Sequence, residues 1–587
     1  AQVAVRFSLV CHFTNSIVRS SSFLQILLLM KTMHIFGIFG ALVPLVEGTS
    51  FLHAGEVNQK EAENSLLAEL ATTFRPGAHS ERISMLESAL KPMISAVPQE
   101  TDGTLSHAVV RYILHRFFVK RHGWFIRGLE PGSEPKNVSA TALKGVEEWV
   151  PSYLQRFLEQ LSGGHGLSLR EMAIFAATLE DLIHREAIER LKLAYTALGF
   201  AQNRLLNDVE ASELLETYMI IYNLGGNFSV ASAKETEMQL EFFASTVKEW
   251  NVTRAWLSNI TSSVQKSLGR KQLDFEATSK IVEEIGEQFA AFNVKDCSKL
   301  KNELLSVESQ KPGRVGLPAF YRKGLISSVF EFNEKEEYLR DLGALDDSSP
   351  SAPHVIIPNY VSSRPNCLIS SSFYVICCRN ECEDLMGSLE DKIKDENANP
   401  AEIIEIVASL SSESVRAPRQ LSAVLTKRLQ DIADIHGGRV PMHGRLFAQW
   451  MHHAFPRECP FPHLTGTINP QTPDEWMRET NQTNTLSKEE METHVNTSTV
   501  DEASDNKELP WHHDEELLKP NPFSTKKTGE PNSRRWFKDV LVLVILCAMA
   551  VGVLQSWKAL LDRDVVSKKA NMKKSRANDD DNHYHLA

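Results

Sequence analysis

The sequence lacks the short motifs by which many enzymes are recognised. It contains no G-x-S-x-G, H-E-x-x-H or G-x-x-x-x-G-K-[ST] pattern and no EF-hand loop. It also has no internal repeat of about 20–50 residues, which argues against a solenoid or a propeller. The catalytic and cofactor-binding residues are therefore unknown from the sequence, and whether the protein is an enzyme stays open.

Basic residues are too few to predict a nucleic-acid partner. The chain has 63 lysines and arginines against 75 aspartates and glutamates, a net charge of −12 over 587 residues. A nucleic-acid interface needs a basic stripe, and the sequence shows none. The composition predicts a soluble chain with no nucleic acid among its partners.

Long apolar runs are scarce, and two stand out near the ends. Residues 540–554, VLVLVILCAMAVGVL, carry no charge. With their flanks they predict a transmembrane helix over 538–557, since about 18–20 apolar residues cross a bilayer. Residues 30–48, MKTMHIFGIFGALVPLVEG, combine a short basic start, an apolar centre and small residues before Thr49. This pattern predicts a cleaved signal peptide.

Residues 1–29 have two interpretations. They are an untranslated leader, or they belong to the protein, and then residues 23–46 form an apolar run that stays as an uncleaved anchor. We expect the cleaved signal. The chain is then a type I single-pass protein of the secretory pathway or cell surface, with the lipid bilayer as a partner and residues 558–587 as a basic cytoplasmic tail.

Sequons and cysteines are consistent with an exported domain. Six N-x-S/T sequons predict glycosylation at Asn137, Asn227, Asn251, Asn259, Asn481 and Asn496. Setting aside Cys11 in the leader and Cys547 in the predicted span, an even number of cysteines predicts up to three disulfides. These candidates are Cys297, Cys367, Cys377, Cys378, Cys382 and Cys459. Because four of them lie between 367 and 382, we expect them to staple one local region.

Hydrophobic periodicity predicts a mainly α protein whose ectodomain is a helical array over 49–310. The clearest helix is 168–198, where Ser168 and Glu171 form a capping box and Gly199 ends the helix. A second long helix is predicted over 236–268. Shorter helices are predicted at 56–74, 80–96, 104–121, 140–161, 208–222, 273–292, 400–410 and 418–435.

The sequence pattern changes from helical periodicity to irregular near residue 310. For residues 311–477 we predict a smaller, irregular, mixed region that contains the clustered cysteines and histidines, with strands at 355–357 and 373–378. Residues 478–533 are rich in Thr, Glu, Asn and Lys. Such a composition cannot bury enough apolar area to offset the entropy of ordering, so it predicts a disordered stalk.

The densest set of metal-ligating residue types lies in residues 436–463, with five histidines and one cysteine. Zinc and copper bind such side chains. The spacing of His443 and His452, with the tract FAQWMH, loosely resembles the copper-binding stretch of tyrosinases and other type-3 copper proteins. The H-x-x-x-H of their second copper site is absent from the chain. The weak metal candidates are His443, His452, Cys459 and His463.

A structural interpretation of the same residues is favoured, with no cofactor. At 100° per residue, His452 falls with Arg445 on the side of a short helix opposite its apolar face. We expect a packed helix and a Pro-rich turn held by Cys459. Elsewhere, Glu180 and His184 are spaced to face either a metal or each other, and residues 109–128 predict a core helix with exposed arginines.

The stretches HGRLFAQW and PRECPFPH, with YVICCRNECEDLM at 374–386, resemble segments of an uncharacterised family of secretory or membrane proteins from dinoflagellate-like algae. The resemblance covers residues 320–477 and implies a secretory or membrane setting with no known activity. From the anchored topology, the stalk and the absence of an enzyme motif, we expect a membrane glycoprotein that acts as a binding, receptor or scaffold protein with an unknown protein partner. The alternative is a luminal or extracellular metal-dependent enzyme that uses the 436–463 histidines with zinc or copper.

Overall fold

The computed structural model describes residues 80–129, 166–224, 233–247, 250–327, 330–368, 371, 374–497 and 510–518. All of them belong to residues 1–519, the first of two units into which the chain divides. The predicted leader, signal peptide, transmembrane helix and tail, two predicted helices (56–74 and 140–161) and the sequons at Asn137 and Asn227 lie outside these residues. Among the helices that the structure describes, none has both the length and the apolar character needed to cross a bilayer.

The prediction of a mainly α protein is confirmed: the described residues form 16 α-helices and seven short strands. We divide them into a first region, residues 80–293, and a second region, residues 300–497, because their apolar side chains gather in separate clusters. The exceptions are Leu368 and, on strand β5, Tyr374 and Ile376, which belong to the core of the first region, and Ala96, which belongs to a cluster of the second.

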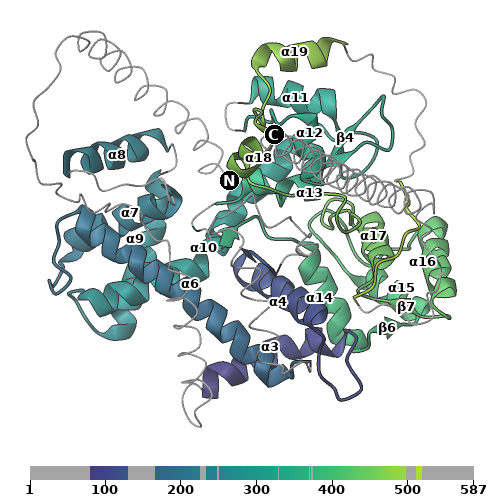
Figure 1. Ribbon diagram of the computed structural model, residues 1–587, viewed down its shortest axis with the longest axis horizontal. Helices are drawn as coiled ribbons and strands as arrows, with labels where there is room; N and C mark the ends of the chain where they lie inside the picture. Colours follow the sequence, from purple (N-terminus) through teal and green to yellow (C-terminus); the bar gives the residue numbers. More distant parts are fainter. Residues whose placement is uncertain are drawn as a thin grey trace, which may run out of the picture. The chain divides into compact units, whose positions relative to one another are not determined.

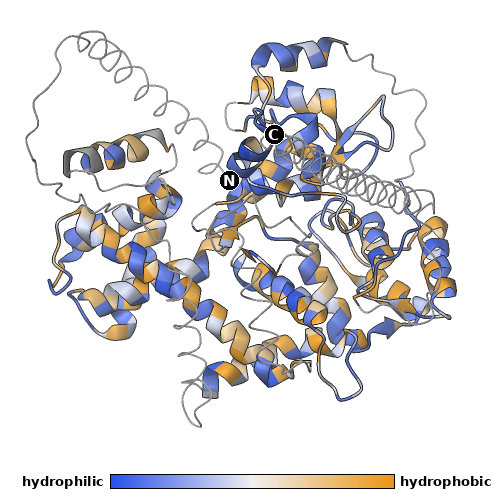
Figure 2. Ribbon diagram, viewed as in Figure 1, coloured by the Kyte–Doolittle hydropathy of each residue, from blue (hydrophilic) through white to orange (hydrophobic). Residues whose placement is uncertain are grey.

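The first region is an array of helices around the long helix α6 (Figure 1). Helices α3, α7 and α10 pack against α6, and α9 packs against α10. Figure 2 shows apolar and polar residues alternating along these helices, as expected for amphipathic helices that share a core. The elements are α3 (Ser80–Ser95), α4 (His107–His122), β1 (Trp124–Ile126), α6 (Leu169–Ala197), α7 (Asp208–Leu224), α8 (Ala233–Thr246), α9 (Trp250–Leu268) and α10 (Phe275–Leu305).

One of the two predicted long helices is confirmed and the other is wrong. Helix α6 begins after Ser168, whose hydroxyl and Glu171 form the expected capping box. Gly199 follows the end of α6 with φ of +67°. The predicted helix 236–268 is instead two helices, α8 and α9. Its apolar stripe repeats every seven residues across the break, from Phe243 to Trp250, so periodicity alone could not reveal the interruption.

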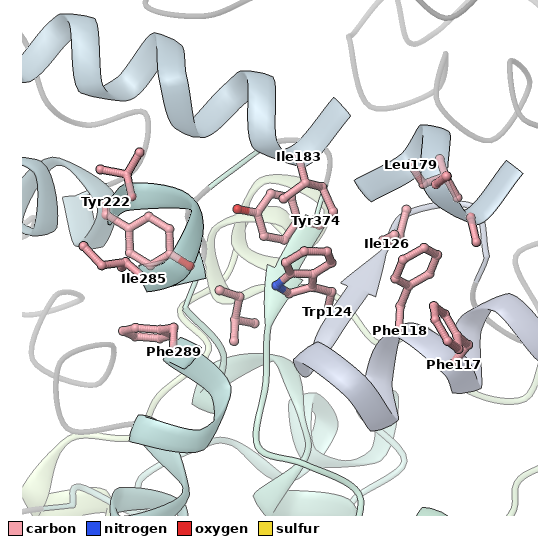
Figure 3. Packing of buried hydrophobic residues seen from close by; sticks show 14 of the residues in the cluster. Phe117, Phe118, Trp124, Ile126, Leu179, Ile183, Tyr222, Ile285, Phe289 and Tyr374 are labelled. Carbon is pink, nitrogen blue, oxygen red and sulfur yellow. The ribbon is translucent and has the colours of Figure 1, made fainter. Parts of the chain in front are cut away.

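The core of the first region is built around Trp124 (Figure 3), whose side chain is 1% exposed. The indole lies beside Tyr374 of β5, with ring centroids 5.8 Å apart, and beside Phe118 of α4, at 6.1 Å. Strand β1 pairs with β5 antiparallel, with Phe125 opposite Val375. The two regions are thus joined by backbone pairing as well as by packing.

The second region combines short helices with small antiparallel sheets. Strands pair in the orders β2-β4-β3 and β6-β7. The strands predicted at 355–357 and 373–378 are present as β4 and β5. The elements are β2 (Arg314–Gly316), α11 (Leu317–Ile326), α12 (Glu336–Asp341), β3 (Leu345–Asp346), β4 (His354–Ile356), α13 (Ile357–Val361), η3 (Arg364–Asn366), β5 (Tyr374–Ile376), α14 (Cys382–Ile393), β6 (Asn397–Ala398), α15 (Pro400–Ser409), α16 (Ala423–Ile435), β7 (Val440–Pro441), α17 (Arg445–Ala454), α18 (Pro473–Thr480) and α19 (Lys488–Thr497).

All six candidate cysteines lie in pairs at disulfide distance. The pairs are Cys297–Cys378, Cys367–Cys377 and Cys382–Cys459. The expectation of one local staple is wrong for two of them, which join positions 81 and 77 residues apart. Adjacent Cys377 and Cys378 bond to different partners, so only Cys367 and Cys377 form a local bridge within the cluster.

The predicted stalk is wrong for its first part, since residues 478–497 are packed. Met491 of α19 is 4% exposed and belongs to the second-region core, while backbone bonds join Leu486 to Asn333 and Lys335 to Asn484. Figure 2 shows α18 and α19 as largely hydrophilic. A polar segment can be ordered because a folded neighbour already supplies the core and the backbone partners. Residues 498–509 and 519–533 lie outside the described residues.

Candidate functional site: a docking surface for residues 510–518

The predicted helix in the histidine-rich segment is α17, and its beginning is completed by a distant acidic residue. The N-cap is Gly444, which has no side chain to cap the helix. Instead, the backbone N–H of Leu446 donates to Oε1 of Glu515 at 3.1 Å. His436 Nε2 lies 2.9 Å from the other carboxylate oxygen. A carboxylate is favourable here because the first N–H groups of a helix lack partners and carry partial positive charge.

Glu515 belongs to residues 510–518, which lie in an extended conformation beside α16 and α17 and are drawn in yellow in Figure 1. Arg445, 6% exposed, holds the main chain of this segment. Its Nε donates to the carbonyl of Asp514 at 2.8 Å, and its backbone N–H donates to the carbonyl of Glu516 at 3.0 Å. Recognition through carbonyl groups fixes the path of the segment and leaves its side chains to other contacts.

Aromatic and charged side chains hold the beginning of the segment. The guanidinium of Arg428 lies 4.9 Å from the ring centroid of Trp511, a cation–π distance. Arg428 Nη1 also donates to Nδ1 of His453 at 2.8 Å, so His453 must be neutral and donate through Nε2 to the carbonyl of Pro510 at 3.2 Å. Burial and the nearby Arg428 lower the pKa of His453 to about 3, in agreement with this arrangement.

The other end of the segment is held by Glu516. Its carboxylate accepts hydrogen bonds from the backbone N–H of Thr465, at 3.0 and 3.1 Å. Between the two ends, the N–H of His512 donates to Oε1 of Gln449 at 3.3 Å. We call the residues that make these contacts the docking surface: Arg428, His436, Arg445, Gln449, His453 and Thr465.

Two of the four metal candidates are engaged in other bonds. Cys459 is paired with Cys382, so it cannot serve as a thiolate ligand. His452 is fully buried, which corrects the expectation that it faces away from the core. It lies between Arg314 Nη1, 2.9 Å from its Nε2, and the carbonyl of Cys459, 2.7 Å from its Nδ1. Since arginine only donates, the proton of His452 is on Nδ1 and its Nε2 lone pair is occupied.

The other two candidates lie in separate places. His463 Nε2 donates to the carbonyl of Gly343 at 2.8 Å. His443 lies near Tyr112, with Nδ1 3.0 Å from the hydroxyl, and near Glu390, with Nε2 3.4 Å from Oε1. The structure does not bring these residues together, and across the described parts of the chain no group of three or more potential ligands is placed to hold a metal.

Glu180 and His184 belong to one ionic network, but they are connected through His122 and Glu287 and not by a direct pair. His122 of α4 lies between carboxylates of two helices, with Nε2 3.5 Å from Glu180 and Nδ1 3.2 Å from Glu287. His184 lies 3.4 Å from Glu287, and Arg82 of α3 is paired with Glu180 at 2.8 Å. This network joins helices α3, α4, α6 and α10.

Arg116 is a charged residue whose role was not expected. The prediction that the arginines of residues 109–128 are exposed is wrong for Arg116, which is 3% exposed. Its guanidinium donates to Glu383 at 2.8 Å and to Glu390. Both carboxylates belong to α14, 267 and 274 residues away, so no local pattern could have indicated them.

No protein-family model, curated protein or solved structure matches the chain. The chemistry of the site therefore rests on its geometry. The docking surface offers main-chain donors, a helix N-terminus and a cationic aromatic contact. These groups can bind an extended acidic polypeptide, and they do so with residues 510–518.

Proposed function

We propose that this protein is a single-pass membrane glycoprotein that acts as a binding, receptor or scaffold protein. The observation that carries the proposal is the docking surface, which holds an extended polypeptide segment through bonds to its backbone and its acidic side chains. Extended peptides are commonly bound through main-chain hydrogen bonds, with side-chain contacts that add specificity.

Two further observations support the exported setting. Three cysteine pairs lie at disulfide distance, and structural disulfides are typical of oxidising compartments. The four sequons among the described residues are exposed, at Asn251, Asn259, Asn481 and Asn496. The anchor itself rests on the apolar run 540–554.

The setting is tested by expressing the full chain in a secretory host and treating it with an N-glycosidase. We expect a mobility shift that shrinks when Asn259→Gln and Asn481→Gln are combined, and we expect the chain to stay in membranes after carbonate extraction. An unglycosylated chain, or one released by carbonate, would remove the membrane-glycoprotein proposal.

The binding role is tested by cross-linking in those membranes and recovering the chain through a C-terminal tag. We expect a polypeptide that is recovered with the wild type and depleted with Arg428→Leu. The matched control is Arg439→Leu, because Arg439 is an exposed arginine that pairs with Asp395 and makes none of the contacts with residues 510–518 described above. Equal recovery with all three chains, or no second polypeptide at all, would count against a binding role for this surface.

A further inference from the structure

We propose that residues 510–518 of one copy of this chain occupy the docking surface of a second copy, so that neighbouring copies are linked by exchanged segments. This inference rests on the proposed function, because anchoring in one membrane is what brings copies together. It names the partner of the docking surface as an identical chain.

The burial of the two sides shows that the segment is held as a surface ligand. None of residues 510–518 is buried, and residues 512–514 are exposed. Two residues of the docking surface beneath it are buried, Gln449 at 0% and Arg445 at 6% exposed. A core element would be buried on its own side as well. Its apolar contacts with the cores are those of Trp511 and Leu518, both only partly buried, so the segment can leave and be replaced without dismantling the fold.

Helix α17 needs an acidic partner from outside its own sequence. Its N-cap is glycine and makes no side-chain bond, so Glu515 supplies the missing acceptor. A second copy carries the same glutamate at the same position of its own segment. The docking surface therefore recognises the side chains of the segment, whether the segment belongs to the same chain or to another copy.

The side-chain pattern of the segment is specific within this chain. Trp511 is the only tryptophan with glutamates four and five residues later. The structure uses all three positions, because Trp511 stacks near Arg428, Glu515 contacts α17 and Glu516 contacts Thr465. The identical segment of a second copy carries the same groups in the same order and can therefore make the same contacts.

Exchange keeps every contact, so the balance between the two arrangements depends on concentration. A chain's own segment competes with an effective concentration on the order of millimolar when linkers are short. Swapping an identical element is a low-cost route to association. Weakening the segment of one copy should therefore open its docking surface to the segment of another.

The test uses two differently tagged full-length chains in the same membranes. The donor chain carries the photo-cross-linker p-benzoylphenylalanine at position 511, where an aromatic side chain is kept. The acceptor chain is the wild type, Glu515→Gln or Asp514→Asn. Asp514→Asn is the matched control, because it removes the same charge from an exposed side chain. Arg445 donates its hydrogen bond to the main-chain carbonyl of Asp514, which this substitution keeps.

We expect a donor–acceptor product that is several-fold stronger with Glu515→Gln than with Asp514→Asn or the wild type, and whose cross-link maps to residues 428–453 of the acceptor. Cross-links found only within the donor, or donor–acceptor products that map outside residues 428–453 of the acceptor, would overturn the proposal. If exchange fails while a different polypeptide is still recovered with the wild type, the binding role stands and only the identity of the partner is wrong. A mobility shift on N-glycosidase treatment of both chains confirms independently that they entered the secretory pathway.

Discussion

Two buried histidines, one in each region, are held by groups of opposite charge. In the first region, burial alone lowers the pKa of His122, but the carboxylates of Glu180 and Glu287 outweigh it and raise the pKa above its ordinary value. In the second region, burial and the cation of Arg314 lower the pKa of His452 far below its ordinary value. The first histidine is a charged member of an ionic network, and the second is a neutral acceptor.

The comparison shows that histidine density is a poor guide to metal chemistry. The second region has more histidines close together in sequence, yet each of its metal candidates is matched to its own partner. What decides the state of a buried histidine is the sign of the charge beside it, and that neighbour is contributed by a different part of the chain.

The largest effect is expected where the two regions meet, at Arg116. Replacing it by methionine leaves the buried carboxylates of Glu383 and Glu390 without their cation. Removing one partner of a buried ionic network costs about 3–5 kcal/mol, and two stranded carboxylates place this change at the upper end. Chemical denaturation of the purified chain should show the loss.

The control for this substitution is Arg270→Met. Arg270 pairs with Asp274 at 2.8 Å, but its side chain is 46% exposed, and such pairs contribute at most about 0.5 kcal/mol. Similar losses for the two variants would mean that the Arg116 network does not hold the regions together.

The next effect should be confined to the second region. Replacing Cys382 and Cys459 by alanine opens a loop of 77 residues, for which chain entropy gives about 4 kcal/mol. The double alanine variant at Cys367 and Cys377 opens a separation of only 10 residues and should cost roughly 2 kcal/mol less. The free energies of unfolding of the two variants measure the difference, and the reverse order would contradict the pairing.

Sequence reasoning succeeded where the signal is local. The capping box at Ser168 depends on residues three apart, and strands β4 and β5 are short apolar runs bounded by turns. The even number of cysteines was informative, but their pairing was not, because it depends on which elements meet in space. The burial of Arg116 and the packing of residues 478–497 were missed for the same reason, since each is settled by partners more than 100 residues away in the chain.

The docking surface shows the same limit more sharply. In the sequence, the five histidines of residues 436–463 indicate a metal site, whereas nothing marks Arg445 as more than their neighbour. Arg445 contacts Asp514, which lies 69 residues later in the chain. The composition there predicts a disordered stalk and gives no sign of this contact. A glycine at the start of a helix, with no capping side chain, was the one local sign that something else completes α17.

The two histidines should respond to pH in opposite ways. His122 has a raised pKa, so its contribution is full below about pH 6.5 and is lost as the pH rises through the folded value. His452 has a lowered pKa, so its contribution is full above about pH 6.5 and is lost as the unfolded chain takes up protons at lower pH. The cost of His122→Gln should therefore be larger at pH 5.5 than at 7.5, and that of His452→Gln larger at 7.5 than at 5.5.

Each difference should reach about 1 kcal/mol, measured by denaturation at the two pH values. His115, whose pKa is lowered to about 3 by burial and by the cations of Arg364 and Arg116, is present in both variants and its effect cancels. Parallel responses of the two variants would show that the charges beside these histidines do not set their protonation.

The smallest effect concerns the capping box, which begins one helix in each region. Ser168 begins α6 and Thr472 begins α18, each with a capping box. Replacing either residue by alanine should cost about 1 kcal/mol of helix stability.

Helix α6 has 29 residues at the centre of the first region and α18 has eight, so the loss of stability should extend over more residues for α6 than for α18. Hydrogen exchange should quicken throughout the first region for Ser168→Ala, but only in residues 473–497 for Thr472→Ala, because a helix of eight residues opens locally at a lower cost than a central helix of 29. Thr472→Ser keeps the hydroxyl and should restore protection. If Thr472→Ala instead loosens the whole second region, α18 and α19 do not open locally, and the contrast between the long and the short helix is wrong.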